Sequence, residues 1–399
     1  MILPGPIQNT QFDEKNLIVE NELTPLLWNR TYGGEENDSG YDIIAVSGGG
    51  FAVTGITDHP EGCVWLLRTD SEGNSLWNQT YDVGTQGISL IEVDSGGFAI
   101  ATADGWLIRT DTDGAVLWNR TYTNEVEDIH FSTLLETRAG DFAIIGYQPG
   151  QNYDLSFWLI DSSGDIINWR TFSGPRDLMD GTWGIDRGYD IIEHSTGGFA
   201  ISASLDGKMA LVRLDVSGNH LWRRIFSAEY SGYGTSLVEV SQGSMLLAGV
   251  VNGDAQVIKT DSNGDVIWQE RYGAVDEDVH MVLRNDESFA LAGTRNDSMW
   301  IARIAANGTK IWEQRLSMTD QVSMAHSIID VSENSLVITG SITSNAPDGP
   351  QTQLLIVAFS DVLVYRESSL PTLLSVAAIG LIFTNIAILE TLRRRRSRN

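Results

Sequence analysis

Hydrophobic and polar positions alternate in short runs along most of this chain, and the runs recur in groups of four. The first complete group reads YDIIAVS (41–47), FAVTGIT (51–57), VWLLRTD (64–70) and SLWNQTY (75–81). The runs are rich in β-branched and aromatic residues and are bounded by Gly, Asp, Asn or Ser, which is typical of β-strands. We therefore predict four strands, A to D, in each repeated unit.

The A–B and C–D connections are short and rich in glycine. The C–D link of the first unit is DSEG (70–73), in which the Asp can accept backbone N–H groups two residues on. Gly73 suits the left-handed position of a type I turn followed by a G1 bulge. The same glycine recurs as Gly114, Gly164, Gly218, Gly264 and Gly308. The EF-hand spacing is absent, so we interpret these turns as hairpins rather than calcium loops.

The D strands carry a tryptophan every 41 to 53 residues, at Trp28, Trp77, Trp118, Trp169, Trp222, Trp268 and Trp312. Four strands at this period predict an all-β fold, the β-propeller. A–B–C triplets begin near residues 41, 88, 128, 188, 233, 278 and 324, which predicts seven blades.

The seventh triplet ends at 356–361 without a turn glycine, while a spare D strand, LLWNRTY (26–32), precedes the first unit. We predict that this N-terminal strand completes the last blade and closes the ring, which removes the final sheet edge. Residues 362–367 (VLVYRE) are the alternative source of that strand.

Two motifs recur in the repeat: L-x-T-D-x-x-G-x-x-x-W, at 67–77 in the first unit, and GGFAI, at 96–100 and 197–201. In these motifs the chain resembles the quinoprotein-like, tryptophan-docking propellers and the wider set of bacterial and archaeal cell-surface propellers, over residues 26–361. The resemblance implies that each tryptophan packs between neighbouring blades. The pyrroloquinoline quinone dehydrogenases of that family use a vicinal disulfide over the cofactor, which a chain with one cysteine, Cys63, cannot form.

The net charge of −27 excludes a nucleic-acid partner, because such binding depends on Lys and Arg that neutralise phosphates. An acidic surface of this kind suits a divalent cation or a cationic partner. The single cysteine also excludes an intrachain disulfide and a CxxC metal site.

The C-terminal region predicts a membrane anchor. Residues 370–389 carry no charge, and about twenty such residues span roughly 30 Å of hydrocarbon as a helix. RRRRSR follows, so the positive-inside rule places the tail in the cytoplasm and the propeller outside the cell. The predicted divisions are a 1–25 extension, a 26–361 propeller, a 362–369 linker, a 370–390 transmembrane helix and a 391–399 basic tail.

The first residues lack a basic region followed by an apolar core, so they do not form a signal peptide. Either the start codon is placed late, or the C-terminal span is the only targeting element. A tail-anchored scaffold that faces the cytosol is a further alternative, which the arginine placement opposes.

The B–C and D–A connections vary in length, and variable loops on a rigid scaffold often carry function. We therefore predict that this face of the propeller binds a protein or glycan partner. The candidate binding residues are Trp183, Asp186, Arg187, Arg176, Asp180, Tyr153 and Asp154. Trp183 lies outside the repeat among charged residues, which suits partner contact; the alternative is that it packs over the channel mouth.

Acidic residues on the same face are candidate calcium ligands: Glu35, Glu36, Asp38, Asp276, Glu277 and Asp278. The alternative is a solvated acidic rim, and we expect no other cofactor. The chain has no catalytic motif, so we predict a non-enzymatic protein, with an extracellular glycan hydrolase or lyase as the alternative. Glycosylation sequons occur at Asn29, Asn37, Asn78, Asn119, Asn296 and Asn307.

Overall fold

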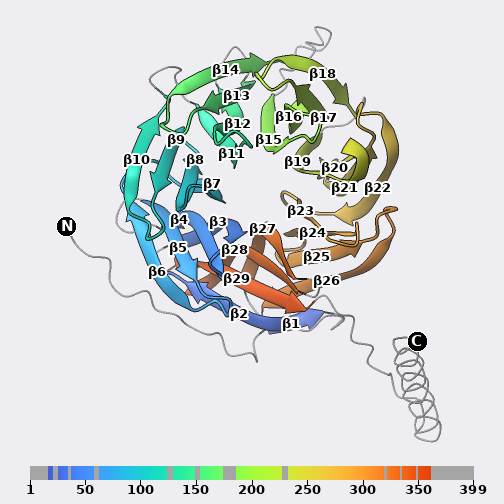
Figure 1. Ribbon diagram of the computed structural model, residues 1–399. Helices are drawn as coiled ribbons and strands as arrows, with labels where there is room; N and C mark the ends of the chain where they lie inside the picture. The colour runs from blue at the N-terminus through green and yellow to red at the C-terminus, as the bar shows by residue number, and fades with distance from the viewer. Residues whose placement is uncertain are drawn as a thin grey trace, which may run out of the picture. The chain divides into compact units, whose positions relative to one another are not determined.

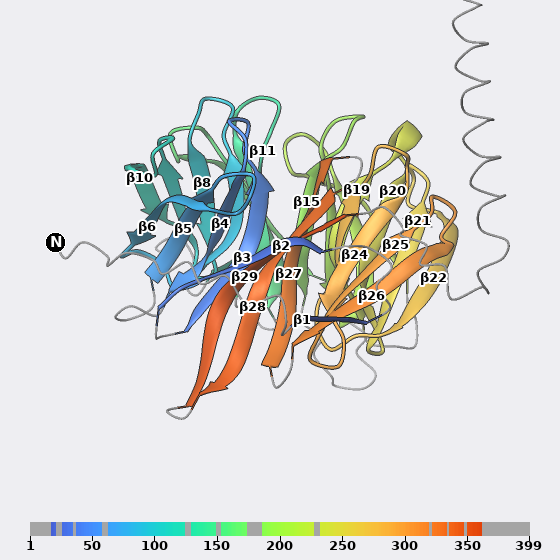
Figure 2. The ribbon, with the colours of Figure 1, turned by 90° about the horizontal axis from the view of Figure 1, so that it is seen from below.

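The propeller predicted from the repeat is confirmed: seven four-stranded blades stand in a ring around a central channel (Figures 1 and 2). The structure is a computed structural model that describes residues 17–20, 26–34, 37–57, 63–123, 129–148, 153–173, 186–226, 232–318, 321–332, 335–346 and 349–360. Each blade is an antiparallel meander whose first strand faces the channel and whose last strand lies at the rim (Figure 1).

The first three blades are built from strands 5 to 8 residues long. Their strands are β3 (Asp38–Ala45), β4 (Phe51–Thr57), β5 (Cys63–Thr69) and β6 (Ser75–Tyr81); β7 (Gly87–Glu92), β8 (Phe98–Thr102), β9 (Trp106–Thr110) and β10 (Val116–Thr121); and β11 (His130–Glu136), β12 (Phe142–Gln148), β13 (Asp154–Ile160) and β14 (Ile166–Phe172). The predicted strands 51–57 and 75–81 match β4 and β6 end for end.

Blades four and five repeat this plan. Their strands are β15 (Arg187–Glu193), β16 (Phe199–Leu205), β17 (Lys208–Leu214) and β18 (His220–Ile225); and β19 (Gly232–Glu239), β20 (Met245–Val251), β21 (Asp254–Thr260) and β22 (Val266–Ala274), with a 3₁₀ turn, η2 (Ser241–Gly243), between β19 and β20.

The last two blades join into one continuous sheet, because β26 and β27 pair at Met318 and Gln321. Their strands are β23 (His280–Leu283), β24 (Phe289–Thr294), β25 (Met299–Ile304) and β26 (Lys310–Met318); and β27 (Gln321–Ser332), β28 (Ser335–Ala346) and β29 (Gly349–Ser360). β1 (Leu17–Glu20), from the predicted N-terminal extension, pairs with β26. The long β28–β29 hairpin extends past the other blades (Figure 2).

The ring closes as the spare tryptophan strand predicts. β2 (Leu26–Tyr32) pairs antiparallel with β29, with Asn29 opposite Val357 and Tyr32 opposite Leu354. The outer strand of the seventh blade therefore comes from the start of the propeller sequence, and it covers the edge of β29. The alternative strand, 362–367, lies outside the described residues.

Neighbouring blades are joined at the C–D turn glycines, all of which have positive φ. A Cβ at Gly73 would lie 2.7 Å from Cζ3 of Trp28, which stands in the outer strand of the previous blade. Gly114, Gly164, Gly264 and Gly308 meet Trp77, Trp118, Trp222 and Trp268 in the same way. The bare glycine backbone thus serves as the surface on which the tryptophan packs.

A tyrosine four residues after the tryptophan completes this contact in four of the joints. Tyr81 donates its hydroxyl to the carbonyl of Gly114 at 2.9 Å, and Tyr122 to that of Gly164 at 3.0 Å. Tyr272 and Tyr32 do the same for Gly308 and Gly73. The repeated ending W-x-x-x-Y therefore recognises the turn of the next blade by packing and by one hydrogen bond.

The joint between blades three and four departs from the rule. Phe157, not Trp169, lies against Gly218. Trp169 instead stacks on Trp158 of its own blade, with ring centroids 5.3 Å apart, and is 38% exposed. The family resemblance implies one docking mode for all tryptophans, whereas here the bulky Phe157 occupies the place above the glycine.

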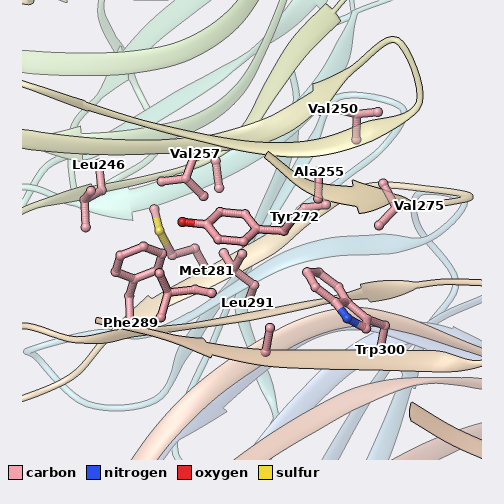
Figure 3. Close-up of a cluster of buried hydrophobic side chains, with 14 residues drawn as sticks. Leu246, Val250, Ala255, Val257, Tyr272, Val275, Met281, Phe289, Leu291 and Trp300 are labelled. Atoms are coloured by element: carbon pink, nitrogen blue, oxygen red, sulfur yellow. The ribbon is translucent and has the colours of Figure 1, made fainter. Parts of the chain in front are cut away.

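The core lies between blades rather than within one. Figure 3 shows the cluster between blades five and six, where Leu246 and Tyr272 of the fifth blade pack against Phe289 and Trp300 of the sixth. Phe289 and Trp300 are fully buried. Each blade thus buries both faces of its sheet, which explains why the B and C strands are almost continuously apolar.

No helix in the described part of the chain could cross a membrane. The predicted transmembrane helix, 370–390, lies outside the described residues, as do the linker and the basic tail.

Candidate functional site

A pocket of about 570 Å³ opens on the face that carries the B–C and D–A connections, across blades three, four and five. Equivalent positions of three consecutive A strands form it: His130, Arg187 and Tyr233. Their cross-strand partners on the B strands, Tyr147, Ser204 and Val250, complete the same layer. The propeller repeat therefore places three unlike side chains at one level around one hollow.

The B–C turns of blades four and five leave this hollow open because they are as short as a hairpin allows. Leu205 pairs with Lys208, and Val251 pairs with Asp254, so each turn has only two central residues. These are Asp206-Gly207 and Asn252-Gly253, all with positive φ, as a type I′ turn requires. The sequence predicts a site on the connections that vary in length, and the pocket lies beside two of the short ones.

Arg187 is held between two tyrosine rings at the centre of the pocket wall. Its guanidinium carbon lies 4.9 Å from the ring centroid of Tyr147 and 4.8 Å from that of Tyr189. Its Nε is buried with no hydrogen-bond partner, and Arg187 forms no ion pair within the described part of the chain. A cation enclosed by aromatic faces in this way keeps its outer N–H groups available to a ligand.

Further stacking fixes the aromatic walls. Tyr189 stacks on Tyr233, with centroids 5.2 Å apart, and His130 stacks on Tyr147 at 4.6 Å. Tyr153, at the rim, meets the ring of Tyr147 edge-on at 5.7 Å, has φ of +58° and is 44% exposed. Because the rings hold one another, the pocket is preformed.

Below the pocket, the A strands line a polar channel of about 340 Å³, which shares Arg187 and Tyr189 with the pocket. Six A strands carry a β-bulge at the same place, which turns one residue into the channel. These residues are Tyr41, Ile88, Ser132, Tyr189, Thr235 and His326. The bulge is the local device that aims a side chain at the axis.

The residue after the bulge joins each blade to the next. Asp42 accepts the N–H of Leu90 in blade two, and Ser89 accepts that of Leu134 in blade three, at 2.8 and 3.2 Å. Thr133, Asp190 and Ser236 continue the ring to blades four, five and six. Ser327 returns to Asp42 at 3.0 Å. The carboxylate oxygens of Asp42 and Asp190 are therefore engaged in hydrogen bonds that join neighbouring blades.

Burial raises the pKa of two channel carboxyls, to about 6 for Asp42 and about 7 for Asp190, although each accepts backbone N–H groups that oppose the shift. Burial lowers the pKa of His280 to about 4, and it also lowers that of His326. His326 is held by the carbonyl of Gly40 at 2.7 Å and stacks on Tyr41. At these four positions burial therefore favours the neutral form of the side chain.

The predicted binding residues do not share one environment in the structure. Tyr153 and Arg187 line the pocket. Asp186 is 4% exposed, and its carboxylate accepts the N–H of Asp206, so it supports a turn instead of facing a ligand. Asp154 begins β13 and is not among the lining residues. Trp183, Arg176 and Asp180 lie outside the described residues.

The predicted calcium ligands do not form a cluster of three or more His, Cys, Asp or Glu side chains within the described ranges. Asp38 is buried and accepts the N–H of Gly34. Asp276 accepts the N–H of Asp297, and Asp278 lines the channel next to the Tyr233 hydroxyl. Glu35 and Glu36 lie outside the described residues. Glu277 is exposed.

Of the sequons, Asn29 lies in β2 opposite Val357 and is 4% exposed. Asn78 is half-buried and accepts the indole N–H of Trp65 at 3.4 Å. The remaining four, Asn37, Asn119, Asn296 and Asn307, are exposed.

Sequence reasoning missed His130, Tyr147, Tyr189 and Tyr233. A usable signal exists: Arg187, His130 and Tyr233 occupy one repeat position, directly before the bulge segment of the A strand. Aligning the seven A strands and asking which start positions carry large side chains would have indicated blades three to five.

These features define a class: a seven-bladed β-propeller of the tryptophan-docking, quinoprotein-like type, with a preformed aromatic pocket at one face. The family model described as Outer membrane protein assembly factor BamB matches residues 160–369, which are 210 of the 399 residues, and the chain belongs to that family. Among curated proteins no match was found.

Solved structures agree on the fold. The WD40 β-propeller domain of Doa1 is 12% identical, with a TM-score of 0.56 over 86% of this chain and 98% of that chain. Sqt1 from Chaetomium thermophilum is 11% identical, with a TM-score of 0.53 over 89% and 88%. Quinohemoprotein alcohol dehydrogenase from Comamonas testosteroni is 10% identical, with a TM-score of 0.50 over 92% and 80%. At these identities the likeness shows the fold alone.

Proposed function

We propose that this protein is a non-enzymatic binding scaffold, and that it captures a protein partner on the face formed by the B–C and D–A connections. The observation that carries the proposal is the pocket built around Arg187. Tyrosine and arginine are the residues that most often dominate the energy of protein interfaces, above all when they are fixed in a preformed, desolvated hollow. Membership of the BamB family, named for an assembly factor, supports an interaction role.

The chemistry of the channel supports binding over hydrolysis. A glycan hydrolase needs two carboxyl groups whose oxygens are available to a sugar and a water molecule. The oxygens of Asp42 and Asp190 accept backbone N–H groups of the polar ring instead. The glycan-acting alternative therefore gains no support from these two residues.

We also propose that the propeller acts outside the cell, held by a helix over residues 370–390. The uncharged stretch and the arginine cluster that follows it are the support for this orientation. Protease treatment of intact cells with a tagged C-terminus should digest the propeller and spare the tag. A propeller that resists digestion until the cells are broken would reverse the orientation.

A photo-crosslinking amino acid tests the binding face. Placed at Tyr153 on the pocket rim, it should give a discrete protein adduct in cells that naturally produce the protein. The matched control is the same amino acid at Leu117, which is 59% exposed on the outer strand β10. Adducts of equal yield at both positions, or adducts only with glycan, would contradict a protein-binding face at the pocket.

A further inference from the structure

The pocket around Arg187 has a composition that restricts its ligand, and this inference rests on the binding function proposed above. It combines tyrosine walls with one cation, Arg187, that has no ion-pair partner among the described residues, in a protein whose net charge is −27. We infer that it takes the C-terminal residue of a partner polypeptide, with the α-carboxylate on Arg187 and an aromatic or large aliphatic side chain among the tyrosines.

The cation calls for a carboxylate. Within the described part of the chain Arg187 has no acidic partner, and its contacts are the faces of Tyr147 and Tyr189. A guanidinium fixed between two rings has lost its side-chain freedom before a ligand arrives, so a fork of parallel N–H groups is presented without further ordering. A planar carboxylate matches that fork, whereas a neutral ligand would leave the charge partly desolvated and unpaired.

The tyrosine walls of the pocket favour a ligand with an apolar group close to its carboxylate. Tyr147, Tyr153 and Tyr233 line the same hollow as Val250 and Gly253. An internal Asp or Glu side chain would satisfy Arg187 and leave these walls empty. A C-terminal residue differs, because its carboxylate and its side chain stand on the same carbon atom, so one residue satisfies both features.

Long-range charge agrees with a single negative group. An acidic segment with several carboxylates would be repelled by the strongly acidic propeller, and Asp278 stands at the channel side of Tyr233. A chain end brings one negative charge, which can be confined to Arg187. The carboxylate then stays on the pocket side, above Asp278.

The test uses the full chain, kept in mild detergent, and pentapeptides of sequence acetyl-GSGS-X, where X is Phe, Tyr, Trp or Leu. Binding is measured by calorimetry and by saturation-transfer NMR. For at least one X, the free acid should bind tenfold or more tightly than the C-terminal amide. The acetyl-GSGSG acid and a peptide with an internal glutamate beside Phe, ending in an amide, should bind at least tenfold more weakly.

Arg187→Gln should abolish the difference between acid and amide, and Arg187→Lys should keep part of it because the charge remains without the fork. Arg120→Gln is the control, since Arg120 is an exposed arginine on β10, paired with Asp165. The comparison of acid and amide on the unmodified protein needs no variant to fold. Equal affinity for the two, or a difference that survives in Arg187→Gln, overturns the inference.

Two outcomes separate this inference from the proposed function. If no peptide with a free C-terminal acid binds, while the photo-crosslinker at position 153 still gives a protein adduct, the inference about the C-terminal residue is wrong. The proposed binding face is then still supported. If acetyl-phenylalanine alone binds as tightly as the pentapeptide ending in Phe, the pocket binds a small carboxylic acid. The inference that it binds the end of a polypeptide is then wrong.

Discussion

At the scale of single residues, Asp190 in the channel holds two blades together and has a raised pKa. Asp190 accepts the N–H groups of Ile191 and Leu237, each at 2.8 Å, and so ties blade four to blade five. Burial nevertheless raises its pKa to about 7, with a smaller effect from Asp42 across the channel. The protonated form is therefore favoured in the folded protein relative to the unfolded chain.

Stability should consequently fall as the pH rises. The contribution of Asp190 is complete below its unfolded pKa of 3.8 and is lost as the pH rises through about 7. Between pH 5 and 7 we expect a loss of roughly 1–2 kcal/mol, below the limit of about 1.4 kcal/mol per pH unit. Denaturant unfolding should show a smaller decline in Asp190→Asn, whatever its absolute stability.

His280 supplies the internal control on this prediction. Its pKa is lowered to about 4, so its contribution is present above 6.5 and is lost as the pH falls through 4. The two groups act in opposite directions below pH 6.5, and His280→Asn should steepen the decline with rising pH. An unchanged slope in Asp190→Asn would show that channel water keeps this carboxylate ionised.

At the scale of elements, the turn between the third and fourth strands performs two tasks. Its glycine adopts positive φ, and the missing side chain makes room for the tryptophan of the previous blade. The sequence predicts the first task from the D-x-x-G turn, and the family resemblance implies the second. The sequence could not predict the exception at Gly218. Phe157 is a C-strand residue, and its position above that glycine depends on packing between blades.

Gly73→Ala tests the two tasks together, and Gly140→Ala tests the backbone alone. Gly140 has φ of +82° with no atom within 4 Å of an added Cβ, so its substitution should cost about 1 kcal/mol. At Gly73 the methyl group would also displace Trp28, and we expect a loss of about 3 kcal/mol. Equal losses in thermal or denaturant unfolding would mean that the tryptophan moves aside without cost.

At the scale of the whole molecule, the sequence predicted the number of blades and the closing strand, because both follow from counting a repeat. The pocket could not be predicted in this way. His130, Arg187 and Tyr233 are about 50 residues apart, and only the curvature of the closed ring brings them to one hollow. Its depth depends on two short turns, Asp206-Gly207 and Asn252-Gly253, and the sequence of such a turn does not indicate that a hollow lies beside it.

Ring closure itself can be tested by truncation, because β2 joins the two ends of the ring: it pairs with β29 of the seventh blade, and its Trp28 and Tyr32 contact Gly73 of the first blade. A chain that begins at residue 35 should expose the edge of β29 and leave Gly73 without Trp28. We expect it to melt well below the full chain and to self-associate in size-exclusion chromatography. A chain that begins at residue 17 keeps β1 and β2 and serves as the control.

Adding back the missing strand makes this prediction sharper. A synthetic peptide of residues 24–34 should bind the truncated chain by strand addition, raise its melting temperature and suppress self-association. The same peptide with Trp28→Ala should bind at least tenfold more weakly, because it keeps the backbone pairing but loses the packing on Gly73. If both peptides restore the chain equally, closure depends on backbone hydrogen bonds alone, and the tryptophan joint does not hold the seventh blade to the first.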